Sequence, residues 1–302
     1  MTEFGTTEFG TTEFCGIELS HPVINGSGTY DALAARRVFG ESFEREFPFS
    51  AYVSKTITLE PRAGNPPPRL WELGQGMINS IGLPNKGLAR FIDEDLPEYA
   101  TLPAPLIVSI MGFKPEELVT MLQRLDGRDE IAAIELNFSC PNVKTGNIVG
   151  SDPSESEAMM AALRPHSNKQ LIAKLAPSTS RPDLVAAAAE SAGADAISLI
   201  NTLPGMAFAP GTSEPWLGAG SGGISGPAIR PVALGQVARV ASAVQIPIVG
   251  MGGVENGRDA AALIDAGARL VAVGTENFRD PAAGNRIASE LSQIRGERVA
   301  TV

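Results

Sequence analysis

The chain has 302 residues, of which 43% are hydrophobic and 19% charged, with a mean hydropathy of +0.05. This composition excludes disordered and fibrous classes and fits a soluble globular protein, whose length one closed barrel can accommodate. The net charge of −10 argues against a nucleic-acid surface, which needs clustered lysine and arginine. No signal peptide and no apolar run of about eighteen residues is found, so we expect a cytoplasmic protein without membrane contact.

Cysteine and histidine are scarce, with two of each in the sequence. Two cysteines are too few for a disulfide framework, a structural zinc or an iron–sulfur cluster built by this chain alone. We therefore expect no metal site and a reducing compartment.

The N-terminal segment, residues 1–13, repeats Thr-Glu-Phe-Gly-Thr and is interpreted as a disordered low-complexity tail. Residues 14–302 are expected to form a single domain. Its first segment, Phe14–Leu19, is predicted to form a short hairpin that closes the bottom of the barrel, with a structural role for Cys15.

Short apolar runs bounded by turn residues predict eight strands, separated by helical patterns that often open with proline or a small polar cap. The strands are expected at Pro22–Asn25, Ala51–Lys55, Leu106–Ile110, Ile131–Asn137, Leu171–Leu175, Ala196–Ile200, Pro247–Gly250 and Leu270–Val273. The clearest helices are expected at Pro115–Leu125, Pro153–Leu163, Pro182–Ala192, Ala228–Ala243, Arg258–Ala266 and Pro281–Ile294. Apolar strands that alternate with helices predict an α/β fold, a (β/α)₈ TIM barrel, with a doubly wound open sheet as the alternative.

The segment Leu59–Gly87 is too long and too rich in glycine and proline for a simple connection. Loops of this length usually serve as lids or binding loops. We expect it to cover the active face of the barrel.

Polar side chains stand where several strands end: Asn25, Lys55, Asn137 and Asn201. Amides donate and accept hydrogen bonds, so this set suits a planar ligand with alternating donors and acceptors, although any one asparagine could instead cap a helix or close a turn. Lys174 lies within an apolar strand and is expected to face an electron-rich or anionic group. A lysine that reaches solvent from an edge strand is the alternative.

Glycine clusters late in the chain indicate a phosphate site. They are Ser221–Gly226, Gly250–Gly253 after the seventh strand, and Gly274-Thr275 after the eighth. Loops in these positions usually bind phosphate in barrels, because bare backbone amides can approach the oxygens. No strand precedes the G-x-G-x-x-G match at Gly218–Gly223, so a Rossmann dinucleotide site is not supported.

Cys140 follows the fourth strand on the active face, where a thiol can act as a base or nucleophile. A buried structural thiol is the alternative. His21 and His166 each precede a strand and are expected at the barrel bottom, away from the chemistry.

The motifs Asn137–Gly146, Ser54–Thr56, Gly64–Pro66, Asn79–Leu83, Asn201-Thr202, Gly222–Pro227 and Gly250–Gly253 together resemble class 1 dihydroorotate dehydrogenase, from about Phe14 to Pro281. The Val143–Gly146 continuation is most similar to the B-type catalytic subunit, which binds FMN and pairs with a separate iron–sulfur flavoprotein. One departure is Ser109, where B-type enzymes more often carry an asparagine that touches the flavin.

This resemblance implies one FMN per chain and oxidation of dihydroorotate to orotate in de novo pyrimidine (UMP) biosynthesis. It implies Cys140 as the catalytic base. It assigns substrate binding to Lys55, Asn79, Ile81, Gly82, Leu83, Asn137, Asn142, Asn201 and Thr202. It assigns cofactor binding to Ser27, Gly28, Lys55, Thr56, Asn137, Lys174, Ile200, Gly223, Gly226, Gly252, Gly253, Gly274 and Thr275.

The resemblance also implies a homodimer core and a partner subunit that carries FAD and a [2Fe–2S] cluster and links the reaction to NAD. A fumarate-linked A-type enzyme, a related dihydropyrimidine oxidoreductase, a flavin-binding barrel without turnover, and a non-redox isomerase or lyase acting on a phosphate remain alternatives. An apolar membrane-binding extension and a serine base, which mark class 2 enzymes, are not found.

Overall fold

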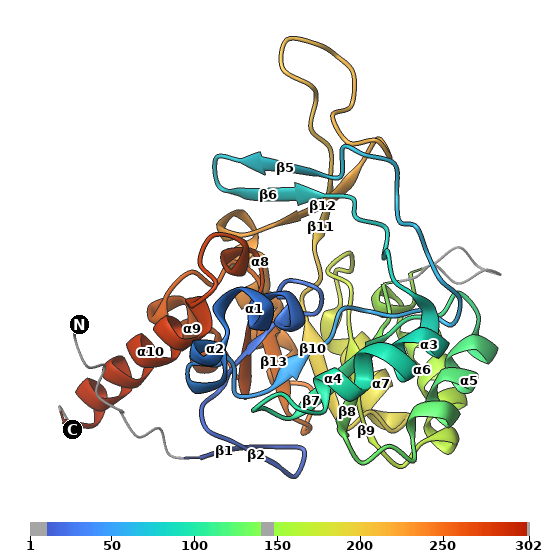
Figure 1. Ribbon diagram of the computed structural model, residues 1–302, viewed down its shortest axis with the longest axis horizontal. Helices are drawn as coiled ribbons and strands as arrows, with labels where there is room; N and C mark the ends of the chain where they lie inside the picture. The colour runs from blue at the N-terminus through green and yellow to red at the C-terminus, as the bar shows by residue number, and fades with distance from the viewer. Residues whose placement is uncertain (1–10, 140–147, 301–302) are drawn as a thin grey trace.

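A parallel eight-stranded sheet forms the centre of the molecule in the computed structural model, which describes residues 11–139 and 148–300, with side chains through Gly296 (Figure 1). Its strands, in spatial order, are β3 (Val23–Asn25), β14 (Leu270–Val273), β13 (Ile248–Met251), β10 (Ala196–Leu199), β9 (Gln170–Lys174), β8 (Ile131–Asn137), β7 (Leu106–Ile110) and β4 (Tyr52–Val53). The predicted (β/α)₈ barrel is confirmed, and the open doubly wound sheet is excluded.

The helices surround this sheet. Five of the predicted helices are found within two residues of the expected bounds, as α5 (Pro115–Leu125), α6 (Pro153–Leu163), α7 (Pro182–Ser191), α8 (Arg230–Ala241) and α9 (Gly257–Asp265). The sixth, α10 (Ala283–Ala300), continues beyond its expected end at Ile294. Proline occupies the first turn of α5, α6, α7 and α8, where its missing N–H costs no hydrogen bond. Short helices that were not predicted lie at α1 (Ala32–Phe39), α2 (Glu41–Arg45), α3 (Gly87–Arg90) and α4 (Leu96–Tyr99), with a π-helical turn, Phe91–Asp95, between the last two. None of the described helices is long and apolar enough to cross a membrane.

The side chain of Asn25 bridges the gap between β3 and β4, where Ser50 also donates to the Val23 carbonyl. The Nδ2 of Asn25 donates to the carbonyl of Val53 at 2.7 Å, and its Oδ1 accepts from the Val53 N–H at 2.8 Å. Asn25 is fully buried and therefore replaces a missing pair of strand-to-strand hydrogen bonds. The expectation that Asn25 joins the ligand site is wrong, because both ends of its amide are used to close the sheet.

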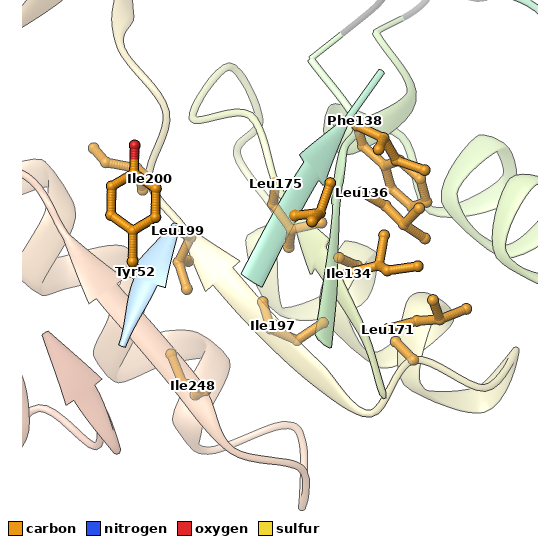
Figure 2. Close-up of a cluster of buried hydrophobic side chains, with 14 of the residues drawn as sticks. Tyr52, Ile134, Leu136, Phe138, Leu171, Leu175, Ile197, Leu199, Ile200 and Ile248 are labelled. Atoms are coloured by element: carbon orange, nitrogen blue, oxygen red, sulfur yellow. The ribbon is translucent and has the colours of Figure 1, made fainter. Parts of the chain in front are cut away.

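The outer face of the sheet packs against the helices. In β8 the alternate residues Ile134 and Leu136, continued by Phe138, are buried with residues of α5 and α6 in one core cluster. Figure 2 shows these three side chains together on the side of the sheet that the helices cover. The strand period of two therefore directs the intervening residues, Glu135 and Asn137, toward the barrel interior.

The barrel interior begins with an apolar layer at the bottom. It includes Val53, Ile107, Ala133, Ile172, Ala196 and Leu270, which cluster with Phe14 and Leu19 of the N-terminal hairpin. This hairpin consists of β1 (Thr12–Phe14) and β2 (Ile17–Leu19). The predicted closure of the barrel bottom is confirmed, although the hairpin begins at Thr12, two residues before the expected start.

A four-stranded antiparallel sheet lies at the opposite end of the barrel from this hairpin (Figure 1). It is formed by β11 (Leu203–Gly205), β12 (Gly222–Ser225), β6 (Gly76–Asn79) and β5 (Leu70–Leu73), in that order. We call it the lid sheet. The segment Leu59–Gly87, expected as a covering loop, contributes β5 and β6 and joins strands that lie far away in the sequence.

Candidate active site

A cavity of about 500 Å³ lies between the upper strand ends of the barrel and the lid sheet, within the size range of small-molecule and cofactor sites. Residues from both ends of the chain meet there. The predicted site residues that line it are Ser27, Gly28, Lys55, Thr56, Asn79, Ile81, Gly82, Leu83, Asn137, Lys174, Ile200, Asn201, Thr202, Gly226, Gly252, Gly253, Gly274 and Thr275.

Three predicted site residues do not appear among those that line the cavity. Cys140 and Asn142 lie outside the described residues. Gly223 lies within β12, where it pairs with Asn79 of β6 and Pro204 of β11. A side chain at Gly223 would collide with Thr202, so this glycine lets the lid sheet approach a residue that does line the cavity.

Glycine turns form one end of the cavity. Gly226 and Gly253 have φ values of +89° and +73°, which favour glycine, and a Cβ on Gly253 would lie 2.7 Å from the Arg230 Cβ. Arg230 donates to the Gly253 carbonyl at 3.2 Å and holds this turn from outside. Thr275 donates to the Ser225 Oγ at 2.9 Å and links the turn after β14 to the lid sheet. Bare backbone at converging turns is suited to an anionic group such as a phosphate.

The floor of the cavity is polar and contains a buried ion pair. The Nζ of Lys174 lies 3.6 Å from the Oε1 of Glu135, and both side chains are nearly inaccessible. Because β9 lies between β8 and β10, the edge-strand interpretation of Lys174 is wrong. The expected anionic group facing this lysine is supplied by the protein itself. The sequence analysis does not identify Glu135. The pattern that could have identified it is its position two residues before Asn137, which places both side chains on the inward face of β8.

Hydroxyl groups connect this floor to the strand ends. Thr56 lies 2.9 Å from the Ser109 Oγ and 3.0 Å from the Ser27 Oγ. Asn137 donates from Nδ2 to Thr56 at 3.5 Å and accepts at Oδ1 from the Ser139 hydroxyl at 2.7 Å. Ser109, the departure from the family pattern, is fully buried and belongs to this network.

Lys55 follows β4 and is half-buried at the cavity wall. Burial lowers the pKa of its ammonium, and the nearby Asp31 carboxylate opposes this effect. Gly28 lies beside the lysine stem, since a Cβ there would be 3.6 Å from the Lys55 Cγ. A partly desolvated cation at a cavity wall is a strong partner for a ligand carboxylate.

The segment Ile81–Leu83 forms the opposite wall below the lid. Gly82 and Leu83 have φ values of +75° and +55°, and the strained Leu83 backbone lies at the cavity. Arg62 donates from Nε to the Gly82 carbonyl at 3.4 Å, and the Asn65 N–H donates to the Ile81 carbonyl at 3.1 Å. Both contacts fix the course of this backbone.

Apolar side chains complete the cavity and were not identified from the sequence. They are Leu70, Met77, Met111, Ile229, Met251 and Phe278, while Gly26, Thr29, Ser139, Ser225 and Ala272 add smaller surfaces. Their residue types are those of any core, so only the tertiary structure distinguishes them. Such apolar walls with a few convergent polar groups suit a flat ring system. Among residues 11–139 and 148–300, no cluster of three or more histidine, cysteine or acidic side chains could hold a metal ion.

Comparisons with known proteins agree with this geometry. The family model for dihydroorotate dehydrogenase matches residues 10–294. The chain is similar to proteins named dihydroorotate dehydrogenase B (NAD(+)), catalytic subunit. It is 45% identical to the one from Citrifermentans bemidjiense over 92% of this chain and 90% of that one, and 44% identical to the one from Desulforudis audaxviator over 94% and 91%. The chain therefore belongs to the dihydroorotate dehydrogenase family, whose members are oxidoreductases of pyrimidine biosynthesis with a flavin cofactor.

Proposed function

We propose that this chain is the FMN-containing catalytic subunit of a B-type dihydroorotate dehydrogenase and oxidises dihydroorotate to orotate in de novo UMP biosynthesis. The observation that carries the proposal is the convergence of Lys55, Asn79, Asn137 and Asn201 on the cavity that the glycine turns close. These residues come from four separate parts of the chain. Lys55 supplies a partner for a carboxylate, the three asparagines supply partners for the edge of a ring, and the glycine turns supply a phosphate site in the same cavity.

FMN fits the chemistry of this cavity. Gly252, Gly253, Gly274 and Thr275 would hold the phosphate, and Lys174, Thr56, Ile200, Ser27 and Gly28 would contact the ring system. A flavin with a single phosphate is favoured over a dinucleotide because no strand precedes the G-x-G-x-x-G match and no Rossmann unit is present in the described residues. When bound, FMN supplies the hydride acceptor of the reaction.

The substrate ring would be held by amides and its carboxylate by a cation. Asn79, Asn137 and Asn201, with Asn142 from outside the described residues, would pair with the donors and acceptors of the pyrimidine ring. Lys55 and the Ile81–Leu83 backbone would hold the carboxylate. Dihydroorotate is favoured over dihydrouracil, since dihydrouracil has no carboxylate for Lys55 to bind.

Cys140 is the proposed base and lies outside the described residues. The segment that precedes it, Asn137–Ser139, brings Asn137 and Ser139 to the cavity wall, which supports a place for the next residue near the ligand. In the proposed reaction the Cys140 thiolate takes the proton from C5 while the hydride leaves C6, and the double bond of orotate forms between these carbons.

The proposal includes a partner subunit for the electrons that leave the site. The relatives are named as NAD(+)-linked catalytic subunits, and the two cysteines of this chain cannot ligate an iron–sulfur cluster. A homodimer of this chain with a subunit that carries FAD and a [2Fe–2S] cluster would complete the path to NAD. The cytoplasm is the proposed location of this complex.

The test is anaerobic single-turnover reduction of the bound flavin by dihydroorotate, followed by its visible spectrum. The wild-type chain is expected to purify with about one FMN and to bleach on addition of substrate. Cys140→Ala is expected to retain the flavin but to bleach about 10²- to 10⁴-fold more slowly, the usual contribution of a positioned base. Cys15→Ala, at the other end of the barrel, is the matched control. A colourless chain that cannot be loaded with FMN would refute the proposed function.

A further inference from the structure

On four consecutive barrel strands, the inward-facing side chains change from apolar to polar at the same level along the barrel axis. On the inward faces of β7, β8, β9 and β10, the apolar residues Ile107, Ala133, Ile172 and Ala196 are each followed two positions later by Ser109, Glu135, Lys174 and Ser198. All four polar residues are buried. Because residues two apart share a face of a strand, these side chains form one polar layer directly beneath the cavity.

Glu135 is the centre of this layer. Its Oε1 accepts from the Ser109 hydroxyl at 3.0 Å and lies 3.6 Å from Lys174 Nζ, and its Oε2 accepts from the Ser198 hydroxyl at 3.1 Å. Burial of an ion pair contributes little net stability compared with apolar residues of the same volume, because both groups lose their water. The position of this pair under a ligand cavity therefore indicates a role in the chemistry rather than in folding alone.

An ionised Glu135 also fixes the direction of the hydrogen bonds that leave it. A carboxylate only accepts, so Ser109 donates its single hydroxyl hydrogen to Glu135 and must accept from Thr56. Thr56 thereby uses its only hydroxyl hydrogen for Ser109, so it can only accept a hydrogen bond from the Nδ2 of Asn137. The Asn137 nitrogen thereby has a fixed acceptor at Thr56, while the N–H and hydroxyl of Ser139 both donate to the Asn137 oxygen and set the same direction from the other side.

We propose that Glu135 is a positioning residue that sets the charge beneath the cavity by pairing with Lys174, and supports the orientation of the Asn137 amide through Ser109 and Thr56. This role rests on the proposed function. Glu135 itself does not line the cavity and acts through Lys174 and Asn137, which do.

The first test is the midpoint potential of the bound flavin. Glu135→Gln keeps the shape of the side chain but leaves the Lys174 charge without compensation, which stabilises the anionic reduced flavin. We expect the potential to rise by at least about 30 mV, a tenfold shift of the two-electron equilibrium. Lys174→Met should lower it, and the double variant should lie near the wild type. Orotate affinity should fall by less than about tenfold in Glu135→Gln, because Ser139 still holds the Asn137 oxygen and only the acceptor at Thr56 is no longer fixed.

The matched control is Asp195→Asn, which also turns a carboxylate into an amide. Asp195 pairs with Arg164 at 2.7 Å and precedes β10 at the barrel bottom, away from the cavity. We expect no change of potential or orotate affinity in this variant. Unchanged potential and unchanged orotate affinity in Glu135→Gln would overturn the proposal.

A second measurement does not require the flavin. In urea unfolding of the flavin-free chain, Glu135→Gln and Lys174→Met should each lower stability, and the double variant should be more stable than the sum of the single effects predicts. Strictly additive effects would overturn the Glu135–Lys174 pairing. A wild-type chain that binds no flavin would instead refute the proposed function and the proposed effect on the flavin potential. The unfolding measurements would still test the Glu135–Lys174 pair in that case.

Discussion

Lys55 and Lys174 are both cavity lysines, but their surroundings give them different chemistry. Lys174 lies opposite a buried carboxylate that is already its partner, whereas Lys55 is half-buried with Asp31 acting only at longer range. A cation without a close counter-charge is the one available to an incoming anion. Lys55 is therefore the residue expected to recognise the substrate carboxylate.

Lys55→Ala is expected to weaken orotate binding by about 1.5–3 kcal/mol, the range for hydrogen bonds to charged groups. Burial lowers the pKa of Lys55, so its ammonium is lost at a lower pH than that of an exposed lysine. Orotate affinity should therefore fall as the pH rises through this lowered pKa, and Lys55→Arg should remove this alkaline loss. Titration of the chain with orotate between pH 7 and pH 10 measures both effects; equal affinities in wild type and Lys55→Ala would remove Lys55 from carboxylate recognition.

His21 makes stability depend on pH at the other end of the barrel. Burial lowers its pKa to about 4, so the unfolded chain binds a proton below pH 6.5 that the folded chain does not. Stability should fall as the pH drops from about 6.5 to 4, by about 3 kcal/mol. His21→Asn keeps an acceptor for the Val23 N–H and should flatten this slope, whereas His166→Gln is the control. If the dependence of stability on pH, measured by urea unfolding, is unchanged in His21→Asn, then other groups cause it.

At the level of elements, the junction between β3 and β4 combines the amide of Asn25 with hydrogen bonds from the N–H and hydroxyl of Ser50 to the Val23 carbonyl. Asn25→Ala would leave the buried N–H and C=O of Val53 without partners, at a cost of about 2–4 kcal/mol in the free energy of unfolding. Asn285→Ala, at a partly exposed asparagine that donates to the Glu46 carbonyl, should change stability far less. Equal effects of the two substitutions in urea unfolding would show that the barrel closes without Asn25.

The turns after β13 and β14 are the elements expected to bind the FMN phosphate. A side chain at Gly253 would strain the turn whatever its charge, so Thr275 is the better position for a test. Thr275→Glu should abolish flavin retention by placing a negative charge at the phosphate, whereas Thr275→Ser keeps the hydroxyl and should retain it. Flavin content is read from the visible spectrum; a yellow Thr275→Glu protein would place the phosphate elsewhere.

For the whole molecule, the path of electrons beyond the flavin is the decisive property. The described residues contain no dinucleotide-binding fold, and the sequence has too few cysteines for an iron–sulfur relay. We expect the isolated chain to reduce dyes with dihydroorotate but scarcely to reduce NAD, and to gain NAD activity with a subunit that carries FAD and [2Fe–2S]. Turnover with NAD, fumarate and a quinone, measured side by side, checks this; rapid fumarate reduction would assign the chain to the A type.

The barrel architecture was predictable from the pattern of amino acids. Apolar runs such as Leu106–Ile110 and Ile131–Asn137 are found as strands with the predicted bounds, because strands buried on both faces are almost continuously apolar between turn residues. Proline at the start of Pro115–Leu125 and Pro153–Leu163 marked where these helices begin. Residues at strand ends were also predictable as site residues, since parallel strands bring their carboxyl ends to one face.

Which of those residues share the cavity and which serve the fold depends on how the strands assemble in space. Asn25 and Asn137 look alike in sequence, yet the amide of Asn25 is used by Val53 across the β3–β4 gap, whereas Asn137 reaches the cavity. The lid sheet pairs β6 with β12, which are far apart in the chain, and no local pattern specifies such a partner. Glu135 gains its role from Ser109, Lys174 and Ser198 on three other strands, because contacts between strands are set by the closure and register of the barrel.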